Sequence, residues 1–312
     1  MWFTRRIDSV AWGSNLAGTQ THSMQIMKPV IHSFTFLILG ALMLQAQDFS
    51  KVEIKATHVA GRVYMLEGAG GNIGVSAGPD GILIVDDQFA PLADKIEAAL
   101  AKLDKGPVRY VLNTHWHGDH TGGNAHFGKS ATIVAHKNVR ERLAGKSETP
   151  PSALPVITFD QSISVHFNGE EIRIYPLPPG HTDGDSVVHF TKSGVLHMGD
   201  LFFNKRFPFI DLASGGSAAG YAKDVQLVLD SVPEGTRIIP GHGELADVKD
   251  LETFRNMLRE TIGLVNEAIG RGETLAQVKV AGVPAAWKDY GAGFINTSRY
   301  LEIVFNSLTE EK

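Results

Sequence analysis

Four side chains of types that commonly bind metal ions occur within six residues of the sequence. They form the pattern His115-x-His117-x-Asp119-His120, directly after a β-rich run. Two histidines at i and i+2 leaving a strand can point to one side and chelate one ion, while a tight turn at Gly118 swings the next two side chains towards a second ion. A closed structural zinc site needs only four ligands, so further ligands elsewhere would indicate a second metal ion.

Three later residues are also of types that bind metal ions, and each lies beside a glycine at the end of a β-rich run. They are His181, Asp200 and His242. A single histidine in such a turn is usually structural, but together with the first cluster these positions make a set of seven. The set divides into two groups bridged by one carboxylate, an arrangement suited to two divalent ions bound by imidazole and carboxylate oxygen.

Composition excludes several other chemistries. The 312 residues include no cysteine, which removes thiol nucleophiles, iron-sulfur clusters and cysteine-based zinc sites. Any metal must therefore be held by His, Asp or Glu. A net charge of -5, with no long run of Lys or Arg, argues against a nucleic-acid partner. The expected partner is a small-molecule substrate. Nothing in the sequence indicates the oligomeric state.

The elements that must position these residues follow a mixed α/β pattern. The predicted strands are 52–54, 62–66, 72–75, 82–85, 108–112, 132–134, 163–167, 171–175, 187–190, 195–198 and 237–239. The predicted helices are 91–103, 138–143, 220–229, 251–269 and 298–308. The first four strands are expected to form an antiparallel meander. A group of strands is followed by helices, and this order occurs twice along the chain. It predicts two halves whose two sheets pack against each other between outer helices.

The first 47 residues differ from the rest and are interpreted as an N-terminal extension and signal peptide. A basic start at Met24 to Lys28, an apolar run over 34–44 and small residues near Ala46 match an export signal, and we expect translation to begin at Met24 or Met27. The apolar run is shorter than a membrane span, so no stable membrane insertion is expected after cleavage. We therefore expect a periplasmic or secreted protein with its catalytic domain at 48–312. An uncleaved anchor or a buried helix is the alternative.

The order and spacing of the seven residues resemble the metal-binding signature of the metallo-β-lactamase superfamily. The resemblance runs from about Val52 to Gly243 and implies an α/β fold, a four-layer αβ/βα sandwich with metals in a groove at one edge of the sheets. It also implies roles for the residues. The first zinc would be held by His115, His117 and His181, the second by Asp119, His120 and His242, with Asp200 between them.

Two positions depart from the best-known β-lactamases of this family. Those enzymes carry Cys where this chain has Asp200, and a substrate-binding Lys where it has Phe203. A bridging Asp instead resembles the glyoxalase II, lactonase and phosphodiesterase relatives. The metal site is therefore better defined than the substrate.

The resemblance implies a dinuclear zinc hydrolase that opens cyclic amides or esters, as a β-lactamase or lactonase does, with a metal-bridging hydroxide as nucleophile. Asp119 is the candidate catalytic residue, because it could orient the water or carry its proton as well as bind metal. The alternatives are a glyoxalase II-like thioesterase or a phosphodiesterase, and a metal-binding or sensor domain without turnover. Iron or manganese could replace the two zinc ions, since the same ligands suit them.

Three further segments have two interpretations each. The aromatic stretch 201–210 would either line the substrate groove, with Lys205 or Arg206 meeting a carboxylate, or simply cover the sheet edge. The glycine-rich stretch 68–72 is expected to be a hairpin turn rather than a mobile flap. Trp116 is expected to be a packing residue. The histidines with no ligand spacing are expected to be structural or solvated: His58, His126, His136, His166, His189 and His197.

Overall fold

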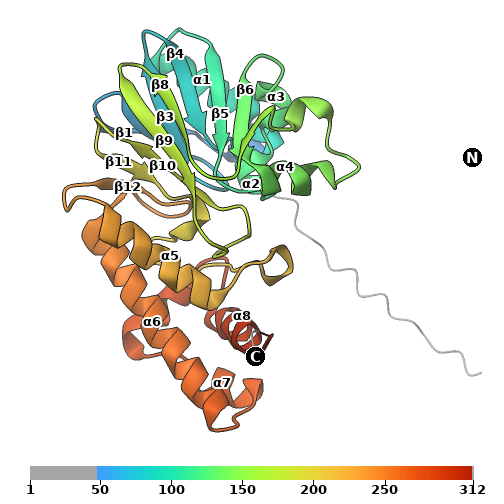
Figure 1. The fold of residues 1–312 in the computed structure, drawn as a ribbon, viewed down its shortest axis with the longest axis vertical. Coiled ribbons are helices and arrows are strands. Elements are labelled where there is room, and N and C mark those ends of the chain that lie inside the picture. The colour runs from blue at the N-terminus through green and yellow to red at the C-terminus, as the bar shows by residue number, and fades with distance from the viewer. Residues whose placement is uncertain (1–47, 311–312) are drawn as a thin grey trace, which may run out of the picture. The chain divides into compact units, whose positions relative to one another are not determined.

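A computed structural model describes residues 48–310, in which two β-sheets face each other and the helices lie outside them (Figure 1). The predicted extension and signal peptide at 1–47 lie outside the described residues. Between residues 48 and 310, no helix combines the length and the apolar character that a membrane span requires.

The first sheet contains seven strands in the described chain, arranged in sequence order. They are β1 (Lys55–Ala60), β2 (Val63–Glu67), β3 (Ile73–Gly78), β4 (Gly81–Val85), β5 (Val108–Asn113), β6 (Thr132–His136) and β7 (Ile157–Phe159). Strands β1 to β4 form an antiparallel meander, in which β2, β3 and β4 match predicted strands and β1 takes the place of the predicted strand at 52–54, and β5 to β7 continue in parallel with β4. Because parallel strands end at a common edge, the segments after β4 and β5 emerge side by side.

The second sheet has the order β13-β12-β11-β10-β9-β8. Its strands are β8 (Ile163–Phe167), β9 (Glu170–Pro176), β10 (Ser186–Phe190), β11 (Val195–His197), β12 (Arg237–Ile239) and β13 (Ala246–Asp247). Asn168 and Gly169 form the predicted hairpin turn, with φ angles of 51° and 79°. Positive φ at both central residues is the geometry that a two-residue hairpin loop needs.

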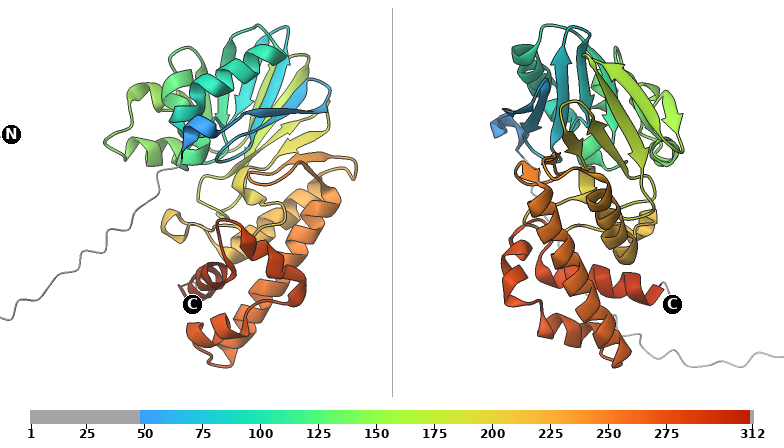
Figure 2. Two further views of the ribbon diagram at one scale, coloured as in Figure 1. Left: turned by 180° about the vertical axis from the view of Figure 1, so that it is seen from behind. Right: turned by 60° about the vertical axis from the view of Figure 1, so that its left-hand side comes forward.

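Helices flank the two sheets (Figure 2). Their bounds are α1 (Ala93–Leu103), α2 (Gly118–Thr121), α3 (Asn124–Phe127), α4 (Lys137–Ala144), α5 (Ala218–Ser231), α6 (Val248–Gly270), α7 (Leu275–Ala281) and α8 (Thr297–Glu310). Helix α6 begins three residues before its predicted start because Asp247 and Asp250 form a capping box at its first turn.

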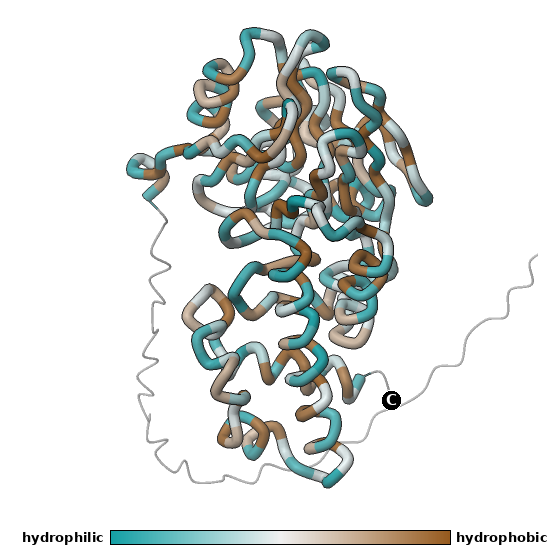
Figure 3. The backbone as a smooth tube through the Cα atoms, turned by 90° about the vertical axis from the view of Figure 1, so that its left-hand side faces the viewer, coloured by the Kyte–Doolittle hydropathy of each residue, from teal (hydrophilic) through white to brown (hydrophobic). Residues whose placement is uncertain are grey.

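Buried hydrophobic side chains form three packed layers: one between the two sheets and one between each sheet and its helices. This follows because successive side chains of a strand point to opposite faces of its sheet. In β4, Ile84 packs towards α1 while the adjacent Val85 packs between the two sheets. In β12, Ile239 packs between the sheets while Ile238 packs towards α5 and α6. Hydrophobic and hydrophilic residues alternate along much of the backbone (Figure 3). The predicted four-layer αβ/βα sandwich is confirmed.

The predicted strand at 52–54 is wrong. Val52 and Ile54 do pack against the core beside α1, but their backbone joins no sheet, and the first strand begins at Lys55. Lys95 explains the difference, because its Nζ donates hydrogen bonds to the carbonyl oxygens of Phe49, Ser50 and Val52. A side chain here satisfies carbonyl groups that a neighbouring strand would otherwise satisfy.

Candidate metal centre

The structure brings all seven predicted residues together at one edge of the two sheets. From the first half of the chain, His115 and His117 follow β5, and Asp119 and His120 belong to the short helix α2. From the second half, the loop between β9 and β10 supplies His181, the turn after β11 supplies Asp200, and the loop after β12 supplies His242.

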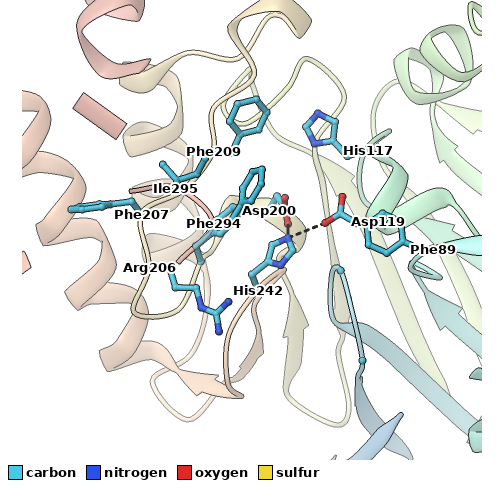
Figure 4. Close-up of a pocket in the computed structure, with 13 residues that line it drawn as sticks. Phe89, His117, Asp119, Asp200, Arg206, Phe207, Phe209, His242, Phe294 and Ile295 are labelled. Atoms are coloured by element: carbon cyan, nitrogen blue, oxygen red, sulfur yellow. Dashed lines mark ion pairs between the residues drawn. The ribbon is translucent and has the colours of Figure 1, made fainter. Parts of the chain in front are cut away.

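The donor atoms form two groups, in each of which all lie within 4.8 Å of one another. The first group is His115, His117, His181 and Asp200; the second is Asp119, His120 and His242. Every one of these side chains is buried or half-buried. Figure 4 shows His117, Asp119, Asp200 and His242 facing a common pocket.

Asp200 lies between the two groups. Its Oδ1 is 3.0 Å from Nε2 of His120 and 3.3 Å from Nε2 of His242. Its Oδ2 is 3.4 Å from Nε2 of His181 and 3.7 Å from Nε2 of His115. One carboxylate oxygen therefore faces each group.

Hydrogen bonds on the far side of two histidine rings determine which nitrogen carries the proton. Nδ1 of His120 donates to the carboxylate of Asp86 at 2.7 Å, and Nδ1 of His181 donates to the carbonyl oxygen of Phe209 at 2.8 Å. When such a ring is neutral, its Nε2 is unprotonated and directed into the cluster. Histidine metal ligands are oriented in this way by partners behind them.

The other two histidines of the motif are held similarly. Nε2 of His117 donates to Asp211 at 3.0 Å, so its Nδ1 faces the cluster. Nδ1 of His115 lies 3.0 Å from the Thr114 hydroxyl, whose own proton goes to Asp86, so the ring nitrogen must be the donor. Nε2 of His115 is then free to accept.

These orientations test whether a metal cation fits. Nδ1 of His117 and Nε2 of His181 lie only 2.9 Å apart, and in these tautomers both carry lone pairs. Nε2 of His115, Nε2 of His120 and Oδ1 of Asp200 are buried without a hydrogen-bond partner among the described residues. Lone pairs converging without protons between them repel one another, and a divalent cation would satisfy them all. The donor set fits metal ions.

The electrostatics of the cluster agree with this conclusion. Burial lowers the pKa of His181 to about 4 and holds that of His115 well below its usual range, so both rings are neutral. Burial also opposes a charge on His242 and His120, but the neighbouring carboxylates outweigh it. They raise the pKa of His242 to about 9 and that of His120 well above its usual range, so that without metal these two rings carry a proton that a bound cation would replace. The two carboxylates thus demand positive charge nearby, which bound cations would supply.

Two carboxylates that support these histidines were not predicted from the sequence. Asp86 follows β4 with a φ of 64° and accepts hydrogen bonds from His120 and from the backbone and hydroxyl of Thr114. Asp211 supports His117. The only sequence signal for Asp86 is its place directly after an apolar strand, at the same sheet edge as His115.

Close packing of the backbone leaves no room for a β-carbon at two glycines of the site. A β-carbon on Gly71 would overlap the ring of His120, and one on Gly241 would overlap the carboxylate of Asp200. The loop 68–72 is also held by hydrogen bonds from Gly71 N to Asp119 O and from Asn72 N to Gly241 O. It is the expected turn, packed against the predicted ligands.

The histidines without ligand spacing lie outside the seven-residue cluster. His197 is buried and bridges the halves, since Nε2 donates to Asn72 O while Nδ1 accepts from Gly199 N. His126, which is half-buried, forms a separate group with the exposed Asp94 and Glu97. Trp116 packs partly buried against the small core of α4 and β6, as expected.

The aromatic stretch 201–210 is divided between the core and the lining of a pocket. Phe202 and Ile210 are buried in the core beside α5 and α6, whereas Phe203 and Phe209 line a pocket of about 530 Å³ that opens onto the predicted ligands. Arg206 also lines this pocket.

Comparison with known proteins agrees with the fold and the site. The sequence profile of the metallo-β-lactamase superfamily matches residues 58–242, more than half of the chain. The chain therefore belongs to this superfamily of metallohydrolases, and its cluster of His and Asp residues is the metal-binding site of a hydrolase.

Individual relatives are distant. The chain is 22% identical over 247 residues to a type 2 metallo-β-lactamase from Bacteroides fragilis, covering 76% of this chain and 98% of that protein. It is 26% identical over 140 residues to a hydroxyacylglutathione hydrolase from Pelagibacter ubique, covering 43% of this chain and 52% of that protein. A metallo-β-lactamase structure from Pontibacter korlensis superposes with a TM-score of 0.58 at 20% identity, covering 66% of this chain and 99% of that one.

Proposed function

We propose that the protein is a dinuclear zinc hydrolase that opens cyclic amide or ester bonds. The observation that carries this proposal is the position of Asp200, which directs one oxygen to each of two ligand groups. A carboxylate shared in this way suits two neighbouring ions better than one. In the proposal, His115, His117 and His181 hold the first ion, and Asp119, His120 and His242 hold the second.

Two zinc ions in this site would activate water as a nucleophile near neutral pH and polarise the substrate carbonyl. Asp119 is positioned to accept the proton that the water molecule loses. Its side chain is 24% exposed, against 5% for Asp200, and it lines the pocket. Burial opposes a charge on Asp119, but His120 and His242 outweigh it and lower its pKa, so its carboxylate is ionised.

The hydrogen bonds behind the ligands keep this geometry fixed during the reaction. Asp86 and Asp211 hold the rings of His120 and His117 in the tautomers that the metals need. Preorganised ligands lose little free energy to rearrangement when charge develops on the substrate.

A thioesterase is the second candidate. Asp200 stands where the best-known β-lactamases of the family carry Cys, and the chain is similar to a hydroxyacylglutathione hydrolase as well as to a β-lactamase. Membership of a hydrolase family argues against a binding or sensor domain without turnover.

The test is metal analysis of the purified protein together with a substrate panel. The panel contains a cephalosporin, a lactone, a thioester and a phosphodiester. We expect two zinc ions per chain and turnover of the lactone or the cephalosporin. One ion per chain would contradict the dinuclear site. Turnover of the thioester alone would favour the second candidate, and turnover of the phosphodiester alone would overturn both.

A further inference from the structure

One wall of the pocket comes from a part of the chain that the superfamily profile does not cover. Phe294 and Ile295 line the pocket although they lie more than fifty residues after the matched region ends at 242. In Figure 4 they lie with Phe207, Phe209 and Arg206 on one side of His242, while Phe89 lies on the other side.

Part of this wall is packed into the core, and part of it is exposed to solvent. Ile295 is only 4% exposed, and the backbone N–H of Phe207 donates to the carbonyl oxygen of Tyr290 at 3.0 Å. The ring of Phe207 also stacks on Tyr300, with centroids 4.3 Å apart. Phe294, in contrast, is 93% exposed. A large apolar side chain held in solvent at the mouth of a pocket is well placed to bury its surface against a ligand.

Arg206 is the single charged group of the pocket lining outside the predicted metal ligands. Its side chain makes no ion pair or hydrogen bond with the described residues, and its stem lies against Gly293, next to Phe294. A guanidinium group is a strong and specific partner for carboxylate oxygens. Lys205, the other cation considered for this role, does not line the pocket.

We propose that Phe294 and Arg206 together form a specificity site that selects amphipathic carboxylates, substrates with a large apolar group close to a carboxylate. The apolar group packs against Phe294 and the aromatic side of the pocket, and the carboxylate pairs with Arg206. The bond to be cleaved then lies over the predicted metal ligands. This inference rests on the proposed hydrolase function, and it adds the class of substrate.

The experiment measures binding by calorimetry on the zinc-loaded full chain, without any reaction. The probes are 4-phenylbutyrate, which has both features, 4-phenylbutanol, which lacks the charge, and acetate, which lacks the apolar group. We expect 4-phenylbutyrate to bind at least about tenfold more tightly than either of the others, as one charge-assisted pair and one buried ring would provide.

Two variants and two matched controls locate the site. Phe294→Ala and Arg206→Gln should each weaken binding of 4-phenylbutyrate by about fivefold or more, and Arg206→Gln should leave 4-phenylbutanol unaffected. Val280→Ala removes an equally exposed apolar side chain, and Lys205→Gln removes the neighbouring cation. Both controls should bind 4-phenylbutyrate as the unmodified protein does.

The results separate this proposal from the hydrolase assignment. Unchanged binding in Arg206→Gln would mean that the metal ions hold the carboxylate, and it would overturn the proposal even if the substrate panel shows hydrolysis. Equal affinity for the acid and the alcohol would overturn it as well. Selective binding that is lost in both variants supports the specificity site, whether or not any member of the panel is turned over.

Discussion

At the scale of single residues, the chemistry of the site depends on which nitrogen of each imidazole carries the proton. Four histidines donate from one ring nitrogen to a partner outside the cluster and direct the other nitrogen inward. The partners are a threonine, a backbone carbonyl and two aspartates. Replacing a partner should therefore change metal affinity without touching a ligand.

Asp211→Asn tests this at the residue scale. The two carboxylate oxygens have different partners, since Oδ1 accepts from Ser214 N and Oδ2 accepts from His117. If the oxygen of Asn keeps the cap at Ser214, its NH2 group faces His117 and cannot accept the ring proton. We expect zinc affinity to fall roughly tenfold, measured by competition with a coloured chelator. Equal affinity in the variant would show that Asp211 does not orient His117.

Asp119→Asn tests the predicted catalytic residue. The change keeps size and shape but removes the carboxylate that could accept a proton, so kcat should fall by a factor of about 10² to 10⁴ while the circular dichroism spectrum stays the same. Asp94→Asn, which alters a carboxylate that is 93% exposed on α1, is the control and should leave kcat unchanged. A full rate in Asp119→Asn would remove this residue from the mechanism.

The seven predicted ligands could be found from the sequence because four of them lie within six residues of one another. The other three each lie beside a glycine at the end of a strand. Asp86 and Asp211 could not be found in the same way. Each is a single acidic residue with no characteristic spacing, and its role depends on a histidine that is 34 or 94 positions away. Only the folded sheet edge brings such pairs together.

At the scale of elements, the turns of the site are limited by close contact with the predicted ligands. Gly71→Ala places a β-carbon where the ring of His120 lies. We expect a loss of about 1–3 kcal/mol in the free energy of unfolding, together with weaker zinc binding. Gly263→Ala in α6 is the matched control, since its β-carbon meets nothing within 4 Å, and a helical Gly→Ala change should stabilise the protein. Urea unfolding of both variants measures the difference.

Helix α5 carries a buried carboxyl group that makes stability depend on pH. Asp224 is fully buried, neither of its oxygens has a hydrogen-bond partner among the described residues, and burial raises its pKa to about 8. The native state therefore keeps a proton that the unfolded chain loses above about pH 4, so stability falls as the pH rises from 4 to 8.

Asp224→Asn should remove this dependence. The variant is expected to be more stable than the unmodified protein by about 1 kcal/mol or more at pH 9, with a smaller difference at pH 5. Urea unfolding at the two pH values measures the effect. Asp230→Asn on the same helix changes a carboxylate that is exposed to solvent, and its difference should be the same at both pH values. A constant difference for Asp224→Asn would contradict the raised pKa.

Most long elements could be predicted from periodicity, and the missed elements are short or lie at the edges of sheets. Strand β13 has two residues, β7 has three, and helix α7 has seven. Strand β1 is an edge strand in which three of the six residues are exposed and none is buried, so its hydrophobic alternation is weak. The run at 52–54 had the stronger apolar pattern, but the contacts of Lys95 decided its backbone instead.

At the scale of the whole molecule, metal should hold the two halves of the sandwich together. Four of the seven predicted ligands precede β6 and three follow β9, so an ion bound by both sets joins the halves. Removing metal with a chelator should lower the free energy of unfolding by about 4 kcal/mol where free zinc had been a thousand times its Kd. Calorimetry should show a lower Tm that recovers when zinc is added back. An unchanged Tm would contradict this coupling.

The place of His242 in the chain has a consequence for biosynthesis. A nascent polypeptide that ends after Asp200 but before Pro240 contains six of the predicted ligands and cannot complete the second group, and it also lacks the Pro240 and Gly243 carbonyls that accept hydrogen bonds from the Asn72 side chain. The complete set of metal ligands therefore forms late in biosynthesis, after the second sheet has been translated and has packed against the first. Chains that terminate early would lack a complete metal site, so they would have no hydrolase activity.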